Sequence, residues 1–181
     1  VLVFAPHPDD EVFGCGGALR QFVSAGAAVR VIVATDGGEG PPDGMARASY
    51  VAVRQKESRR AAEQLGGYEL VFWSYADRQL RYGERLVEEC LAAIEAWRAD
   101  LVLAPSHFEV HPDHRALAMC VLEATRRWRQ ARLALYEVGQ PLPHPNVLLD
   151  IGAAFDAKLA AMRCFESQLK RQDYPSQIAA L

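Results

Sequence analysis

The sequence lacks the features that mark several classes of protein. Its four cysteines form no Cys-x-x-Cys pair and stand far apart, at Cys15, Cys90, Cys120 and Cys164. This spacing argues against a disulfide framework or a structural zinc site and predicts free thiols, three of them on inward-facing helix positions. No apolar run reaches the roughly 20 residues of a membrane span, and no segment has the pattern of a signal peptide. We therefore expect a cytoplasmic protein without a transmembrane segment.

An excess of basic charge is also absent. Lys and Arg total 20 against 23 Asp and Glu, which gives a formal net charge of −3. The local arginine clusters at 59–60 and 126–129 fit solvated helix faces, so we expect no nucleic-acid partner. The rest of the composition is ordinary for a globular protein, with 50% apolar and 24% charged residues. The length predicts one domain over residues 1–181 with a sizeable core, and it leaves the oligomeric state open.

Strand and helix patterns alternate along the chain. Apolar and β-branched runs predict strands at 1–5, 29–35, 69–73, 101–104 and 133–138, and a short extra strand at 147–151. Helical spacing predicts helices at 14–25, 47–65, 84–97, 114–129 and 155–169. This alternation implies βαβ units, so we predict a Rossmann-like, three-layer α/β/α fold with a mainly parallel sheet. The expected strand order is 3-2-1-4-5 plus the extra strand, which puts strands one and four side by side where the winding reverses.

Two clusters of His and acidic residues follow strands one and four. The first is His7-Pro8-Asp9-Asp10-Glu11 and the second is His111-Pro112-Asp113-His114. In open α/β sheets, ligands bind outside the carboxyl ends of the strands at the point where the order reverses. Imidazole and carboxylate ligands suit zinc or a neighbouring divalent ion, and a catalytic zinc usually takes three of them. The clusters therefore predict one metal site, with more candidate ligands than it needs.

The surplus residues fit hydrolytic chemistry. A bound metal lowers the pKa of its water to roughly 7, an adjacent carboxylate takes the proton, and a second imidazole stabilises an oxyanion or protonates a leaving amine. A nucleotide-binding turn at Gly14, Gly16 and Gly17 is a weaker alternative, because the glycine pattern is incomplete and the three carboxylates before it would repel phosphate. Each cluster taken alone also fits an ordinary Pro-Asp turn.

These residues resemble the LmbE-like, or PIG-L, family of zinc-dependent de-N-acetylases. The segment from Ala5 to Glu11 is similar to the family's first signature, and His111–His114 is similar to its second. Weaker likenesses are an Arg-x-x-Glu helix that ends in Leu-Gly and a late helix with a lysine and a Ser-Gln pair: Arg54, Glu57, Leu65, Gly66, Lys158, Ser167 and Gln168. Members of the family remove acetyl groups from N-acetylglucosamine conjugates. The resemblance therefore implies a metal-dependent hydrolase of such an amide, with a small amino-sugar conjugate as its partner.

The resemblance also implies a role for each candidate residue. The metal, Zn²⁺ or else Fe²⁺, would be held by His7, Asp10 and His114. Catalysis would fall to Asp9 as general base, His111 as oxyanion stabiliser and Asp113 as the partner that orients an imidazole. The sugar would be bound by Arg54 and Asp77.

Rival functions and several details stay open. An amidase acting on a thiol conjugate or another non-sugar amide would use the same centre, whereas a silent sugar- or metal-binding module would not need Asp9. A polyhydroxylated ligand is favoured if Arg54 and Asp77 point into the metal pocket. The stretch 35–40 after the second strand has one more glycine than the family pattern, which leaves the identity of the substrate open. The chain opens inside a predicted strand and is short at its C-terminus for this family, so we expect native terminal residues beyond it.

Overall fold

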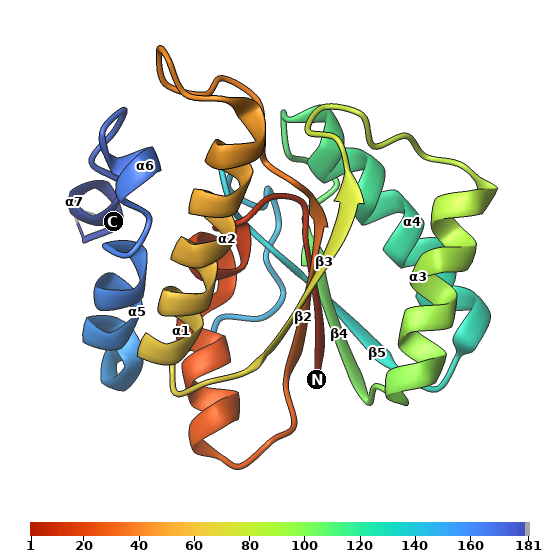
Figure 1. Cartoon of the computed structure of the whole chain (residues 1–181). Helices are drawn as coiled ribbons and strands as arrows, with labels where there is room; N and C mark the ends of the chain where they lie inside the picture. Colours follow the sequence, from red (N-terminus) through yellow and green to blue (C-terminus); the bar gives the residue numbers. More distant parts are fainter. Residues whose placement is uncertain (180–181) are drawn as a thin grey trace.

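A five-stranded parallel sheet lies between two layers of helices in the computed structural model, which describes residues 1–179 (Figure 1). The strands are β1 (Leu2–Ala5), β2 (Arg30–Thr35), β3 (Glu69–Tyr75), β4 (Leu101–Pro105) and β5 (Arg132–Tyr136). Their order is β3-β2-β1-β4-β5, and every neighbouring pair is parallel. The Rossmann-like α/β/α architecture and the predicted strand order are confirmed.

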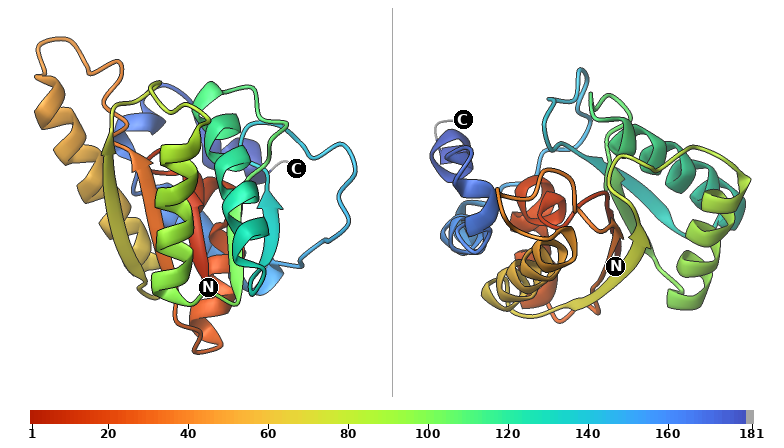
Figure 2. Two further views of the ribbon diagram at one scale, coloured as in Figure 1. Left: turned by 90° about the vertical axis from the view of Figure 1, so that its right-hand side faces the viewer. Right: turned by 45° about the horizontal axis from the view of Figure 1, so that its top comes forward.

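Helices cover both faces of this sheet. One face carries α1 (Asp10–Ser24) and α2 (Arg47–Gln64), with α5 (Phe155–Met162) packed outside them, and the other carries α3 (Glu84–Trp97) and α4 (Pro112–Trp128) (Figures 1 and 2). The remaining short helices are η1 (Gly152–Ala154), α6 (Glu166–Leu169) and α7 (Tyr174–Ala179). Within residues 1–179, none of these helices combines the length and the apolar character that crossing a membrane requires.

The sequence of β1 explains why the sheet is covered twice. Leu2 and Phe4 join the core cluster on the α3–α4 side, whereas Val3 and Ala5 join the cluster on the α1–α2 side. None of these four side chains is exposed. A strand that is apolar at every position is stable in the middle of a parallel sheet with both faces buried. The loops that follow β1 and its neighbour β4 therefore emerge together at the centre of one edge.

Helix α1 begins at Asp10, before the three glycines rather than at the first of them. A Cβ atom on Gly14 would lie 2.4 Å from a ring carbon of Tyr136, and one on Gly17 would lie 2.7 Å from the Ile151 side chain. The glycines thus allow close packing of α1 against β5 and the segment before η1. They lie within α1, which is kinked at Cys15 (φ −119°, ψ 19°), and the N-terminus of the helix lies before them at Asp10, so the geometry gives the nucleotide interpretation no support.

The predicted extra strand at 147–151 is wrong. The chain leaves β5 through the proline-rich loop, and residues 137–151 extend away from the body of the protein (Figure 2, left). Val147 and Leu148 are 76% and 89% exposed and pair with no strand among the described residues. A β-branched, apolar sequence stabilises a strand only when it packs against sheet neighbours, and this segment has none.

The single helix expected at 155–169 is also wrong in detail. It is interrupted between α5 and α6, where Phe165 adopts a non-helical conformation (φ −86°, ψ 56°). Phe165 is fully buried, and its ring packs edge-on against Phe13 of α1 at a centroid distance of 5.6 Å. The break lies where this aromatic side chain enters the core. Helix α7, which follows, was not predicted.

Candidate metal centre

Loops at the carboxyl ends of β1, β3 and β4 bring the two His/Asp clusters together. His7, Asp9 and Asp10 follow β1, Asp77 follows β3, and the segment 111–114 opens α4 after β4. The loop after β1 is tied to β2, because both the backbone N–H and the Oγ1 hydroxyl of Thr35 donate to the carbonyl of Pro6, at 2.9 and 2.8 Å. The predicted switch point of the sheet is therefore where the candidate residues meet.

Three ligand-type atoms face one another at the centre of the site. His7 Nδ1 lies 3.0 Å from Asp10 Oδ2 and 3.2 Å from His114 Nε2, and His114 Nε2 lies 3.1 Å from the same Asp10 oxygen. Around a tetrahedral zinc ion with bonds of about 2.0–2.1 Å, two ligand atoms stand about 3.3 Å apart. All three residues are buried. The donor set and its spacing fit a single divalent ion.

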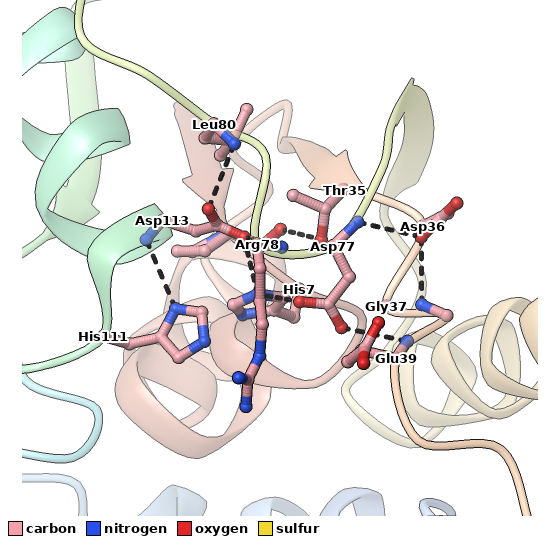
Figure 3. Close-up of polar contacts among 12 residues, drawn as sticks. His7, Thr35, Asp36, Gly37, Glu39, Asp77, Arg78, Leu80, His111 and Asp113 are labelled. Atoms are coloured by element: carbon pink, nitrogen blue, oxygen red, sulfur yellow. Dashed lines mark hydrogen bonds and ion pairs between the residues drawn. The ribbon is translucent and has the colours of Figure 1, made fainter.

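Two other sets of possible ligands have donor atoms within 4.8 Å of one another: His7 with His111 and His114, and His7 with Asp77 and Asp113. The second set uses the other ring nitrogen of His7. His7 Nε2 lies 3.2 Å from Asp77 Oδ1 and 3.3 Å from Asp113 Oδ2 (Figure 3). Because a ligating imidazole commonly donates its second N–H to a carboxylate, Asp77 and Asp113 are placed to orient His7.

Asp113 is itself held by the loop after β3. Its carboxylate accepts backbone N–H groups from Arg78 at 2.6 Å and from Leu80 at 3.1 Å, and its side chain is fully buried (Figure 3). Arg78 has a positive φ of 65°, which aims its N–H at this carboxylate at the cost of backbone strain. The β3–α3 loop and the β4–α4 loop are therefore fixed to each other through Asp113.

Opposing charges set the protonation of the three central residues. Burial raises the pKa of Asp10, but the imidazoles of His114 and His7 outweigh it and hold that pKa well below its usual range. Burial lowers the pKa of both imidazoles, but Asp10 and other carboxylates outweigh it, raising the pKa of His7 well above normal and that of His114 to about 9. The pocket thus stabilises positive charge between these groups, and a divalent cation supplies such charge in place of protons.

Asp9 lies beside these three residues in a strained backbone conformation. Its φ of 148° and ψ of −28° fall in a region that costs a non-glycine residue about 1–3 kcal/mol. Asp9 Oδ2 accepts a 2.7 Å hydrogen bond from Arg54 Nη2 in a buried ion pair. Burial raises the pKa of Asp9 to about 6, against the opposing charge of Arg54. A carboxylate whose pKa approaches neutrality is suited to act as a general base.

Arg54, from α2, donates its hydrogen bonds to other groups of the protein. Nη2 also donates to the Pro8 carbonyl at 2.8 Å, and Nη1 donates to the Gly37 carbonyl at 3.0 Å. Arg54 and Asp77 both line a polar cavity of about 520 Å³ next to the centre. Both therefore face the site, where Arg54 supports Asp9 and Asp77 supports His7. Direct contact of either residue with a sugar stays a prediction.

His111 presents an N–H group to the site. It caps the N-terminus of α4, where its Nδ1 accepts the backbone N–H of Asp113 at 3.3 Å. Burial and the charges of His7 and His114 lower its pKa, which favours the neutral ring. A neutral imidazole that accepts at Nδ1 carries its proton on Nε2. The His111 ring centroid is 4.7 Å from that of His7, which puts this donor at the edge of the centre.

Glu109 belongs to the site but was not predicted. Its Oε2 lies 3.4 Å from His114 Nδ1, and its carboxylate accepts backbone N–H groups from Val138, Gly139 and Gln140. The residue is only 2% exposed. A carboxylate behind an imidazole fixes the orientation and tautomer of the ring. The one sequence signal was an acidic residue shortly before His114 in the same loop.

The two weaker sequence likenesses are joined in space. Glu57 of α2 accepts both the backbone N–H and the hydroxyl of Ser167, at 2.8 and 2.6 Å. The neighbouring Gln168 donates to the Tyr50 hydroxyl at 2.8 Å and lines the polar cavity. These contacts attach the C-terminal segment to α2 beside the site.

Comparisons with known proteins agree with the sequence resemblance and with the fold. The PIG-L family model, described as GlcNAc-PI de-N-acetylase, matches residues 2–125. Diacetylchitobiose deacetylase of Thermococcus kodakarensis is 31% identical over 93% of this chain and 69% of its own. The solved structure of N,N'-diacetylchitobiose deacetylase from Pyrococcus horikoshii has a TM-score of 0.83 at 27% identity, covering 92% of this chain and 69% of that one. GalB, the 4-carboxy-2-hydroxymuconate hydratase of Pseudomonas putida, has a TM-score of 0.79 at 24% identity, covering 99% and 83%, and shares the fold alone.

Proposed function

This chain belongs to the PIG-L family of GlcNAc-PI de-N-acetylases, and we propose that it hydrolyses an N-acetyl amide on an N-acetylglucosamine-type sugar conjugate with a bound zinc ion. The observation that carries the proposal is the set of three ligand atoms, 3.0–3.2 Å apart, next to the buried carboxylate of Asp9. A silent binding module needs no such base. The deacetylase activity named for the Thermococcus relative supports an amino-sugar amide as the substrate.

We assign the metal to His7 Nδ1, Asp10 Oδ2 and His114 Nε2. Two neutral imidazoles and one carboxylate leave a divalent ion with net positive charge and an open position. A divalent ion held there would supply a Lewis acid for the amide carbonyl and would lower the pKa of a water molecule that serves as the nucleophile. Zinc is the proposed ion, and Fe²⁺ shares the same preference for imidazole and carboxylate ligands.

The remaining steps follow from the positions of the side chains. Asp9, held by Arg54, takes a proton from the attacking water, whose oxygen joins the carbonyl carbon. His111 Nε2–H donates a hydrogen bond to the oxyanion that develops on the carbonyl oxygen. The C–N bond then breaks, the protonated Asp9 carboxyl gives its proton to the departing amine, and acetate and the free amino sugar are released. Asp77 and Asp113 keep His7 in position through Nε2.

The polar cavity is the proposed place for the sugar. Its lining offers carboxylates, an amide and guanidinium groups to hydroxyl partners: Glu39, Arg54, Asp77, Gln168 and Arg171. This composition favours a polyhydroxylated ligand over a thiol conjugate without a sugar.

The direct test combines metal analysis with acetate release. Wild type and Asp9→Asn are assayed for zinc content and for acetate released from N-acetylglucosamine and diacetylchitobiose. We expect one zinc per chain in both proteins, with turnover reduced about 10²–10⁴-fold in the variant, because a general base contributes that much. Asp43→Asn, the same substitution at an exposed loop residue, is the matched control and should keep full activity. Absence of metal affinity, or equal turnover by Asp9→Asn, would contradict the proposal.

A further inference from the structure

Two cavities of different chemistry meet at the metal centre. The polar one, of about 520 Å³, is the proposed sugar site. A second cavity of about 680 Å³ borders the same centre. Most of its lining surface is apolar, and its apolar side chains come from α1, the β4–α4 connection, the segment after β5 and α7: Phe13, Val110, Pro112, Val138 and Ile178. Polar side chains line it too, among them Glu109, Gln140, Gln172 and Gln177. The proposed reaction leaves this second cavity without an occupant.

The residues shared by the two cavities locate the boundary between them. Both are lined by Asp9, Asp10, Arg78, His111 and Tyr174. This shared set includes the proposed base and the proposed oxyanion donor. A carbonyl carbon that reacts there lies on the border, so the two ends of the substrate extend into different cavities.

The geometry of an amide assigns those ends. A secondary amide is planar and strongly prefers the trans form, in which the acyl and amine substituents point in opposite directions. If the amine end, the sugar, occupies the polar cavity, the acyl end enters the apolar one. An acetyl group ends in one methyl and leaves most of 680 Å³ unfilled, whereas pockets of about 300–1,000 Å³ suit ligands of much larger size.

We propose that the apolar cavity is an acyl-chain site and that the chain acts, besides N-acetyl sugars, on amino sugars N-acylated with groups well beyond acetyl, in the range of eight carbons. This inference rests on the proposed function and specifies the acyl class that the same centre takes. The reaction is unchanged: the water oxygen joins the acyl carbon, the C–N bond breaks, and the products are a fatty acid carboxylate and the free amino sugar.

The test is a series in which only the acyl group changes. N-acetyl-, N-butanoyl- and N-octanoyl-glucosamine are compared by kcat/KM with zinc-loaded protein. A fully buried methylene favours binding about fourfold, and this cavity is open to solvent on one side, so we expect octanoyl to exceed acetyl by at least about tenfold. Titration of octanoate against acetate, measured by calorimetry, should show the same order without turnover.

A matched pair of variants links the effect to the cavity. Val110→Asp puts a charge into the apolar lining at a residue that is 71% exposed, so its fold should be unaffected. Val147→Asp makes the same change at a residue that is 76% exposed and lines neither cavity. The octanoyl-to-acetyl ratio should fall towards one in Val110→Asp and stay at the wild-type value in Val147→Asp.

The failure of this inference can be separated from the failure of the proposed function. If the acetyl substrate is cleaved and kcat/KM stays flat or falls as the acyl chain lengthens, the acyl site is overturned and the deacetylase is kept. A second series compares methyl and octyl glycosides of N-acetylglucosamine, and a gain there instead would assign the cavity to the aglycone. If no amide in either series is cleaved, the proposed function fails, and equal binding of octanoate and acetate would then overturn the acyl site as well.

Discussion

Replacing Arg54 with methionine separates two interpretations of this residue. The sequence resemblance implies contact with the sugar, whereas the structure shows Arg54 holding Asp9, Pro8 and Gly37. If Arg54 acts on the sugar, Arg54→Met raises KM and leaves stability and kcat nearly unchanged. If Arg54 positions the base, the substitution lowers both kcat and stability, because a buried carboxylate loses its partner.

The size of the stability loss follows from the contacts. Arg54 is 5% exposed and Asp9 is 7% exposed, so their ion pair is largely screened from water. Removing one partner of a buried pair costs about 3–5 kcal/mol, and two carbonyl groups also lose a donor. For a domain of this size, about 3–5 kcal/mol corresponds to a fall in Tm of roughly 6–20 °C. The total stability of a typical domain is only about 5–15 kcal/mol.

The assay measures urea unfolding and steady-state kinetics at a fixed zinc concentration. The double variant Arg54→Met with Asp9→Asn removes the charge that the single variant leaves unpaired. It should therefore be more stable than Arg54→Met alone. A stability loss below about 1 kcal/mol in Arg54→Met, or a double variant no more stable than the single, would refute the positioning role.

Two further substitutions test the surroundings of the centre. Gly37→Ala should lower kcat, because Gly37 has a φ of 59° and an added Cβ would lie 2.4 Å from Arg54 Nη1. Gly44→Ala is the matched control, since Gly44 also has a positive φ, of 78°, but an added Cβ would meet no atom within 4 Å. Equal activity in the two alanine variants would contradict the steric argument. Glu109→Gln should weaken zinc affinity about 10–100-fold in competition with a chelator, since it removes the carboxylate behind His114; unchanged affinity would show that Glu109 does not orient the ring.

The positions of the site residues follow from sequence because topology determines them. Once β1 and β4 are recognised as neighbours at the reversal of strand order, the loops after them must meet, and His7 and His114 come together without any knowledge of side-chain packing. The 3.0–3.2 Å spacing of the ligand atoms in the centre could not be predicted from the sequence in this way. It depends on Asp113 and Glu109, whose partners are backbone N–H groups of other loops. Every residue except proline has a backbone N–H group, so the sequence does not indicate which of these groups bind a carboxylate.

The C-terminal region was predicted least well for a related reason. The helical pattern of 155–169 and the β-branched pattern of 147–151 are local signals, whereas the structure there is decided by distant partners. Phe165 interrupts the helix because Phe13 of α1 offers it a buried contact. Val147 and Leu148 form no strand because no sheet edge comes near them. Local propensity is a weak guide wherever tertiary contacts compete with it.

The loop after β2 contains one more glycine than the family pattern, and one of its glycines, Gly37, packs against Arg54. The additional glycine there left the identity of the substrate open, because this loop was expected to border the substrate. In the structure, Gly37 is the residue that lets the Arg54 guanidinium pass beneath the loop, with no side chain in its way. Arg54 in turn holds Asp9 in a conformation that costs about 1–3 kcal/mol. Gly37 therefore acts on the proposed base, Asp9, through Arg54, and specificity is to be sought in the two cavities that Asp9 lines.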